Sequence, residues 1–115
     1  MGVARGDLRT FLRASYEGAA QPEIAPVLRA MASEAVRDAT FAQALREFTA
    51  ERRAVLQALL ERHGAPTAQA ELLADLAFGL LWYRTIVGHR RPDRRAADET
   101  AALLAGAVTG VSATA

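Results

Sequence analysis

The sequence predicts an all-α fold, a bundle of five helices in a single domain. Of its 115 residues, 51% are hydrophobic, and nearly half of these are alanine, the residue with the highest helix propensity. Larger apolar side chains recur every three or four residues between breaks at proline and glycine, as on one face of an α-helix. No segment shows the strict polar–apolar alternation of a half-buried strand. The length fits one domain.

The first two helices are expected at residues 7–20 and from Pro22 or Glu23 to Arg37. Asp7 is the expected N-cap of the first, since a carboxylate there accepts from free backbone N–H groups. Pro26 falls in the first turn of the second helix, where the missing N–H costs least.

The third helix is expected from Asp38 or Thr40 to His63, and Gly64 supplies its C-terminal stop. The fourth is expected from Thr67, as a possible N-cap, to Val87 or Gly88.

The fifth helix is expected at residues 94–109, with Asp93 as its N-cap. The predicted domain therefore covers residues 7–110, between an N-terminal tail at 1–6 and a flexible C-terminal tail at 111–115.

The charges are nearly balanced, with 14 basic residues, all arginine, against 13 acidic ones and a net charge of +1. This balance gives little electrostatic reason to expect nucleic-acid binding by this chain alone. The N-terminus lacks the apolar core of a signal peptide. The most apolar run, residues 76–83, is far shorter than the roughly 20 residues needed to span a bilayer. We therefore expect a soluble cytoplasmic protein with no membrane partner.

Residues that bind metals or act as nucleophiles are scarce. The chain has no cysteine, and its two histidines, His63 and His89, stand in no Glu-x-x-His spacing. No glycine-rich phosphate loop follows a strand. We therefore expect no metal site, no cofactor and no enzymatic activity. His89 is more typical of a helix-end group than of a ligand-binding or pH-sensing residue.

The fourth helix is apolar on two opposite faces. At 100° per residue, one face carries Leu72, Leu76, Gly79, Leu80, Tyr83, Ile86 and Val87, and the other carries Leu73, Ala77, Phe78, Leu81 and Trp82. A helix that is apolar all round is buried all round. It can pack inward on its own domain and outward on a second copy; the alternative is the central helix of a monomer.

The fifth helix is rich in alanine on nearly every side, which permits close packing against another helix. The last two helices of two copies would then form a four-helix dimer seam. The interface residues predicted for this homodimer are Leu72, Leu76, Gly79, Leu80, Tyr83, Val87, Leu103, Leu104 and Val108.

Five sequence stretches stand in a characteristic order. They are GDLRTFLR at 6–13, VLRAMASEA at 27–35, FAQALREF at 41–48, RRAVL at 52–56 and ADLAFGLLWYR at 74–84. A proline-containing turn and a terminal helix follow. In this order the chain resembles the C-terminal domain of TetR-type (tetracycline-repressor-like) transcriptional regulators over nearly its whole length.

The resemblance implies an effector-sensing and dimerisation domain. In that family a helix-turn-helix region precedes such a domain and reads operator DNA, and that region is absent from this chain. A small-molecule effector shifts the population toward a conformation that does not fit the operator.

Larger or polar-tipped side chains on the inner faces of the helices are the candidate ligand-binding residues: Tyr16, Met31, Phe48, Arg52, Phe78 and Trp82. Aromatic rings and methionine suit the wall of a small-molecule pocket, although plain core packing is the alternative for each. Arg52 has three possible roles: it meets an anionic ligand, pairs with Glu34 or Asp75, or extends to solvent. The mostly apolar set favours an apolar or aromatic effector. The alternative function is a helical protein–protein interaction module without a ligand.

Overall fold

Five helices make up the described part of the chain, joined by short turns. The structure is a computed structural model that describes residues 3–114, with the side chains of residues 6–108. Its helices are α1 (Val3–Ala20), α2 (Ala25–Arg37), α3 (Ala39–Arg62), α4 (Thr67–Val87) and α5 (Arg94–Thr114). No strand occurs within residues 3–114, and the all-α prediction is confirmed.

Aspartates cap two of the helices: Asp93, the predicted N-cap of the fifth helix, and Asp38, one of the two predicted starts of the third. The Asp38 carboxylate accepts from the backbone N–H groups of Thr40 at 2.9 Å and Phe41 at 3.1 Å. The Asp93 carboxylate accepts from the N–H of Ala96 at 3.0 Å. Each bond satisfies an N–H group that has no partner within its own helix, which fixes where α3 and α5 begin.

Other boundaries differ from the sequence prediction. Asp7 is not an N-cap, because α1 begins at Val3: no proline interrupts the preceding residues, so the helix continues back through them. Pro66, rather than Thr67, is the N-cap of α4. The segment before Ala25 forms a turn, so α2 begins later than expected.

The fifth helix extends past its predicted end, through Gly110 to Thr114. A single glycine lowers helix stability by only about 1 kcal/mol and need not end a helix. Of the tails predicted at 1–6 and 111–115, residues 1, 2 and 115 lie outside the described residues.

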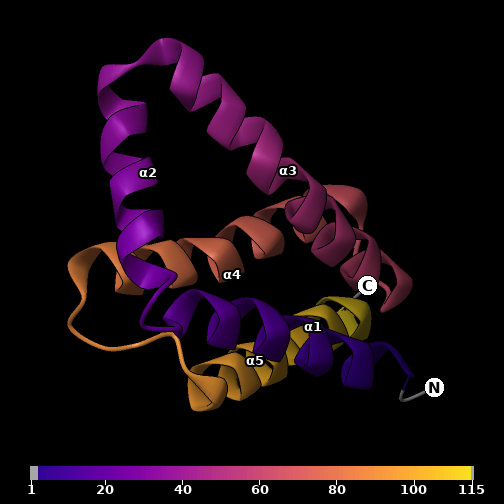
Figure 1. Cartoon of the computed structure of the whole chain (residues 1–115). Helices are drawn as coiled ribbons and strands as arrows, with labels where there is room; N and C mark the ends of the chain where they lie inside the picture. Colours follow the sequence, from indigo (N-terminus) through magenta and orange to yellow (C-terminus); the bar gives the residue numbers. More distant parts are fainter. Residues whose placement is uncertain (1–2, 115) are drawn as a thin grey trace.

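Helices α1 and α5 lie side by side and run in opposite directions (Figure 1). Arg13 on α1 pairs with Asp98 on α5 through two bonds, Nε–Oδ1 at 2.7 Å and Nη2–Oδ2 at 2.9 Å. One turn further along α1, Glu17 pairs with Arg94 at 2.7 Å. The partner positions ascend on one helix and descend on the other, as in an antiparallel pair.

The packed core lies between α1, the C-terminal half of α3, the inner face of α4 and α5. Its largest fully buried side chains are Tyr16, Leu8, Leu12, Leu56, Leu60 and Val108. Alanines make up most of the buried face of α5, so each of these positions buries only a small apolar area. By contrast α2 contains no buried residue. It extends away from the α1–α5 layer and meets α3 at the far end of the molecule (Figure 1).

The two apolar faces of α4 are separated in the structure as the helical spacing predicts. Leu73, Ala77 and Leu81 are buried in the core. On the opposite face, Leu76 and Tyr83 remain 58% and 57% exposed. One apolar face of α4 is thus covered by this chain, and the other is left uncovered.

Candidate functional site

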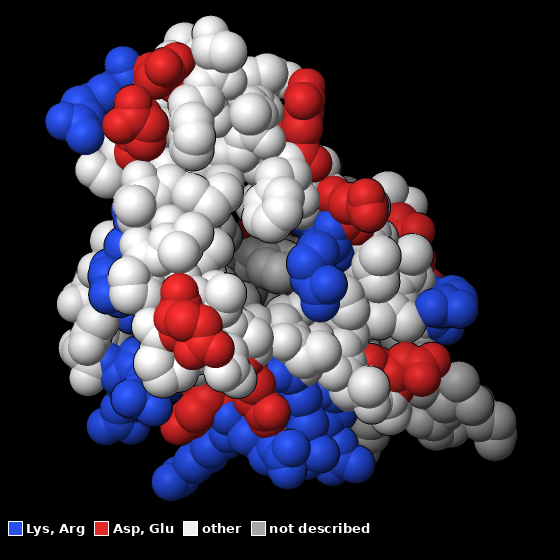
Figure 2. Space-filling view, viewed as in Figure 1, with Lys and Arg blue, Asp and Glu red and all other residues white. Residues whose placement is uncertain are grey.

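A pocket of about 530 Å³ lies between the first four helices. Helix α2 contributes no buried residue to the core, and the space between it and the other three helices is this pocket. Figure 2 shows the molecule hollowed there, with uncharged side chains around most of the opening and a basic side chain beside it. The volume falls in the range of small-molecule binding sites.

Small side chains on α1 leave room for the pocket. Ala14, Ser15, Gly18 and Ala19 recur at i, i+1, i+4 and i+5, so they share one face of the helix. A Cβ atom added at Gly18 would meet no atom within 4 Å. Ile24 and Leu28, at the start of α2, form the adjoining apolar wall.

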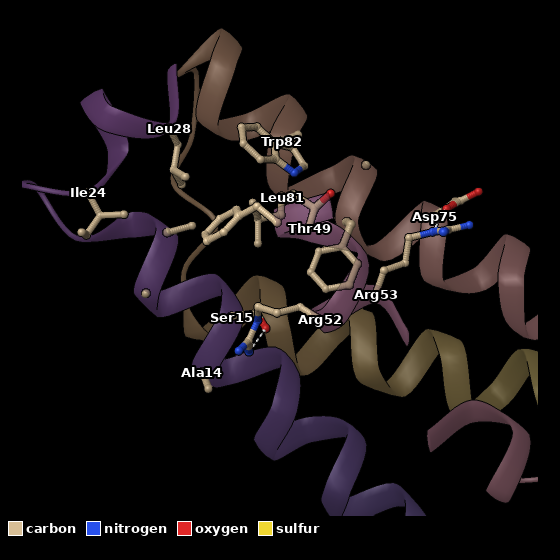
Figure 3. Close-up of a pocket in the computed structure, with 15 residues that line it drawn as sticks. Ala14, Ser15, Ile24, Leu28, Thr49, Arg52, Arg53, Asp75, Leu81 and Trp82 are labelled. Carbon is tan, nitrogen blue, oxygen red and sulfur yellow. Dashed lines mark hydrogen bonds and ion pairs between the residues drawn. The ribbon is translucent and has the colours of Figure 1, made fainter. Parts of the chain in front are cut away.

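Helices α3 and α4 supply the larger side chains. The lining residues of α3 are Phe48, Thr49, Arg52 and Arg53, and those of α4 are Asp75, Phe78, Gly79, Leu81 and Trp82. The aromatic rings give the pocket broad apolar walls, with few polar groups among them (Figure 3).

Arg52 is held in position by two residues of α1. Its Nη2 donates to the Ser15 hydroxyl at 2.7 Å, and its guanidinium carbon lies 4.8 Å from the centre of the Phe11 ring. The Phe11 ring in turn packs edge-on against Phe78 at 6.2 Å. Figure 3 shows Arg52 reaching from α3 to Ser15. Cation–π contact and hydrogen bond together orient the guanidinium.

Arg53 is neutralised by acidic groups of α4, whereas Arg52 is not. Arg53 Nε lies 2.6 Å from Asp75 Oδ1, and its Nη2 lies 3.8 Å from Glu71. Within residues 6–108, no carboxylate lies within ion-pair distance of Arg52. The pairing of Arg52 with Glu34 or Asp75 that the sequence allowed is therefore wrong; its neighbour in the sequence takes Asp75.

Four of the six predicted ligand-binding residues line the pocket: Phe48, Arg52, Phe78 and Trp82. Tyr16 and Met31 do not. Tyr16 is completely buried beneath the pocket, where its hydroxyl donates to the Ala77 carbonyl at 2.6 Å. Burial raises the pKa of this phenol, which keeps it a donor. Met31 lies further along α2 and is only partly buried.

Sequence reasoning missed the small residues of the pocket. The predicted residues were large side chains that form a wall, whereas a cavity also needs positions where the side chains are short. The signal was present in the spacing of Ala14, Ser15, Gly18 and Ala19 on one face of the first helix.

The second candidate site is the uncovered apolar face of α4. Of the residues predicted for the dimer interface, Leu72, Leu76, Tyr83 and Val87 are exposed on α4, and Leu103 on α5 is 74% exposed. Leu80 is partly buried, and Gly79 lines the pocket. Leu104 and Val108 are buried within this chain's own core, so they do not belong to the exposed face. Small alanines alone could not fill that core, and these two side chains complete it.

Within the described residues, no cluster of three metal-ligating side chains occurs, and no helix has the length and hydropathy needed to cross a membrane. His89 is exposed, and its ring lies 5.4 Å from that of Tyr83 just beyond the end of α4.

The chain matches the family model described as "Tetracyclin repressor-like, C-terminal domain" over residues 1–104. No curated protein and no solved structure matches the chain. The family match covers nearly the whole chain, and the all-α fold is consistent with it. The chain belongs to the tetracycline repressor-like C-terminal domain family.

Proposed function

We propose that this chain is the effector-sensing and homodimerisation domain of a TetR-type transcriptional regulator. The observation that carries the proposal is the pocket of about 530 Å³ between the first four helices, with its apolar and aromatic walls. Such a pocket fits an apolar or aromatic small molecule. Family membership supports a regulatory role rather than an enzymatic one. As part of a regulator of transcription, the domain would act in the cytoplasm.

The pocket is placed where a ligand can act on helix positions. The pocket is lined by α2, which contains no buried residue, and by α1 and α4, which contribute to the core. A ligand that fills the space between them would favour one arrangement of α2 over others, because it binds that arrangement better. In a protein that also carries a helix-turn-helix, such a shift would control binding to operator DNA.

Binding of neutral apolar probes tests this proposal. Trp82 is the chain's single tryptophan and lines the pocket, so its fluorescence reports occupancy. We expect saturable changes with 1-octanol and a rise in melting temperature. The matched variant is Gly18→Leu, whose side chain would enter the pocket without a backbone clash; it should abolish both effects. Failure of octanoate and 1-octanol alike to bind the wild-type chain would refute the proposal.

The exposed apolar face of α4 supports the second function, a dimerisation module that binds no ligand. Both functions predict a dimer, since large apolar patches on a protein surface mark interaction sites. They differ in the pocket: the module predicts no fluorescence change with any apolar probe.

A further inference from the structure

We infer that the pocket takes an apolar molecule that ends in a single carboxylate, with Arg52 and Ser15 as the groups that bind this carboxylate. The inference rests on the proposed function and specifies the chemical class of its ligand. It is carried by the charge of Arg52 and by the hydrogen-bonding groups that line the pocket.

The charges that line the pocket do not cancel. Arg53 and Asp75 form an ion pair at 2.6 Å, which leaves the positive charge of Arg52 without a partner among the described residues. A ligand with one negative charge would balance it.

The polar groups left unpaired beside Arg52 are hydrogen-bond donors. A guanidinium has five N–H groups and no acceptor, and the described residues account for one of those of Arg52, bonded to Ser15. Because the Ser15 oxygen accepts from Arg52, its own hydrogen is available to a ligand. Thr49, in contrast, donates back to the carbonyls of its own helix. A carboxylate, which only accepts, complements Arg52 and Ser15.

The geometry separates the charged end of the pocket from its apolar end. Phe11 and Ser15 hold the guanidinium against α1. Figure 3 shows the Trp82 ring on the opposite side of the pocket from the Arg52–Ser15 pair. An elongated molecule can therefore place its carboxylate at Arg52 while its apolar body lies along Phe78 and Trp82.

A matched pair of probes tests the inference: octanoate and 1-octanol share a chain length and differ in charge. With Trp82 fluorescence as the readout, wild-type protein should bind octanoate about tenfold more tightly, the order expected for a hydrogen bond to a charged group. Arg52→Gln should remove that preference and leave 1-octanol binding unchanged. Arg52→Lys should keep part of it.

The control is Arg62→Gln, which removes the same charge from the same helix at an exposed position away from the pocket. It should bind both probes as the wild type does. Equal affinity of the wild type for the two probes, or an unchanged preference in Arg52→Gln, would overturn the inference while the proposed function stands. Failure of both probes to bind would refute the proposed function itself.

Discussion

The Tyr16 hydroxyl on α1 donates a 2.6 Å hydrogen bond to the backbone carbonyl of Ala77 on α4. Both residues are completely or almost completely buried, at 0% and 1% exposure. Both have a pocket residue as a neighbour in the sequence: Ser15 precedes Tyr16, and Phe78 follows Ala77. The bond therefore joins the two helices next to the pocket and fixes how far each is shifted along its axis relative to the other.

Replacement of this tyrosine tests the contribution of the bond. Tyr16→Phe keeps the ring and removes the donor, so the free energy of unfolding should fall by about 1 kcal/mol, the usual net value of one hydrogen bond. Urea denaturation measures the change. Tyr83→Phe is the matched control, with both substitutions compared in the Leu76→Glu background so that dimerisation does not contribute: that ring is exposed on the outer face of α4, and loss of its hydroxyl should leave stability unaltered. Equal effects of the two substitutions would contradict the assignment.

The pairing of α1 with α5 should make stability depend on pH in the acid range. The hydrogen bond from Arg13 lowers the pKa of Asp98 below its ordinary value. A carboxyl with a lowered folded-state pKa contributes stability above its unfolded pKa of about 4, and the contribution is lost as the pH falls through the folded value. Asp98→Asn should therefore be less stable than wild type at pH 7, and the difference should shrink below about pH 4.

Denaturation curves at a series of pH values measure this dependence. Glu23→Gln is the control, since this exposed carboxyl forms no ion pair among the described residues. A stability difference for Asp98→Asn that stays constant down to pH 2 would show that the ion pair with Arg13 does not contribute.

The exposed apolar face of α4 predicts self-association. Leu76→Glu places a charge where apolar side chains are uncovered, so a dimer that uses this face should dissociate into folded monomers at micromolar concentration. Val36→Glu introduces the same charge at an 87% exposed position on α2 and should leave the dimer intact. Sedimentation velocity distinguishes these states. A wild-type chain that sediments as a monomer would refute the predicted homodimer.

Gly79 should limit the stability of α4. It lies inside the helix, and a Cβ atom there would meet nothing within 4 Å. Gly79→Ala should therefore raise the free energy of unfolding by about 0.5–1 kcal/mol, because alanine loses less backbone entropy on folding. The comparison is made in the Leu76→Glu background, so that dimerisation does not contribute. A loss of stability would mean that the space beside Gly79 is needed.

The elements of the fold followed from the sequence because local signals specify them. Proline, glycine and the capping carboxylates Asp38 and Asp93 mark helix ends, and the 3.6-residue period separates the two faces of α4. The tertiary placement of single residues is not local. Whether Tyr16 faces the core or the pocket depends on how far α4 is shifted along its axis relative to α1.

The composition of the pocket shows the same limit. Arg52 and Arg53 are neighbours in the sequence; the approach of α4 brings Asp75 to Arg53, and the approach of α1 brings Ser15 to Arg52. Leu104 and Val108 were predicted at the dimer seam because they are the large side chains of an alanine-rich helix. For the same reason they fill the core.

A crystal structure with 8-bromooctanoate tests the central claim most directly, because the anomalous signal of bromine locates the apolar end of the ligand. The account predicts bromine between α1 and α4 near Trp82 and Phe78, with the carboxylate at Arg52 and Ser15. Bromine on the outer face of α4, or a pocket that stays empty at saturating ligand, would contradict it.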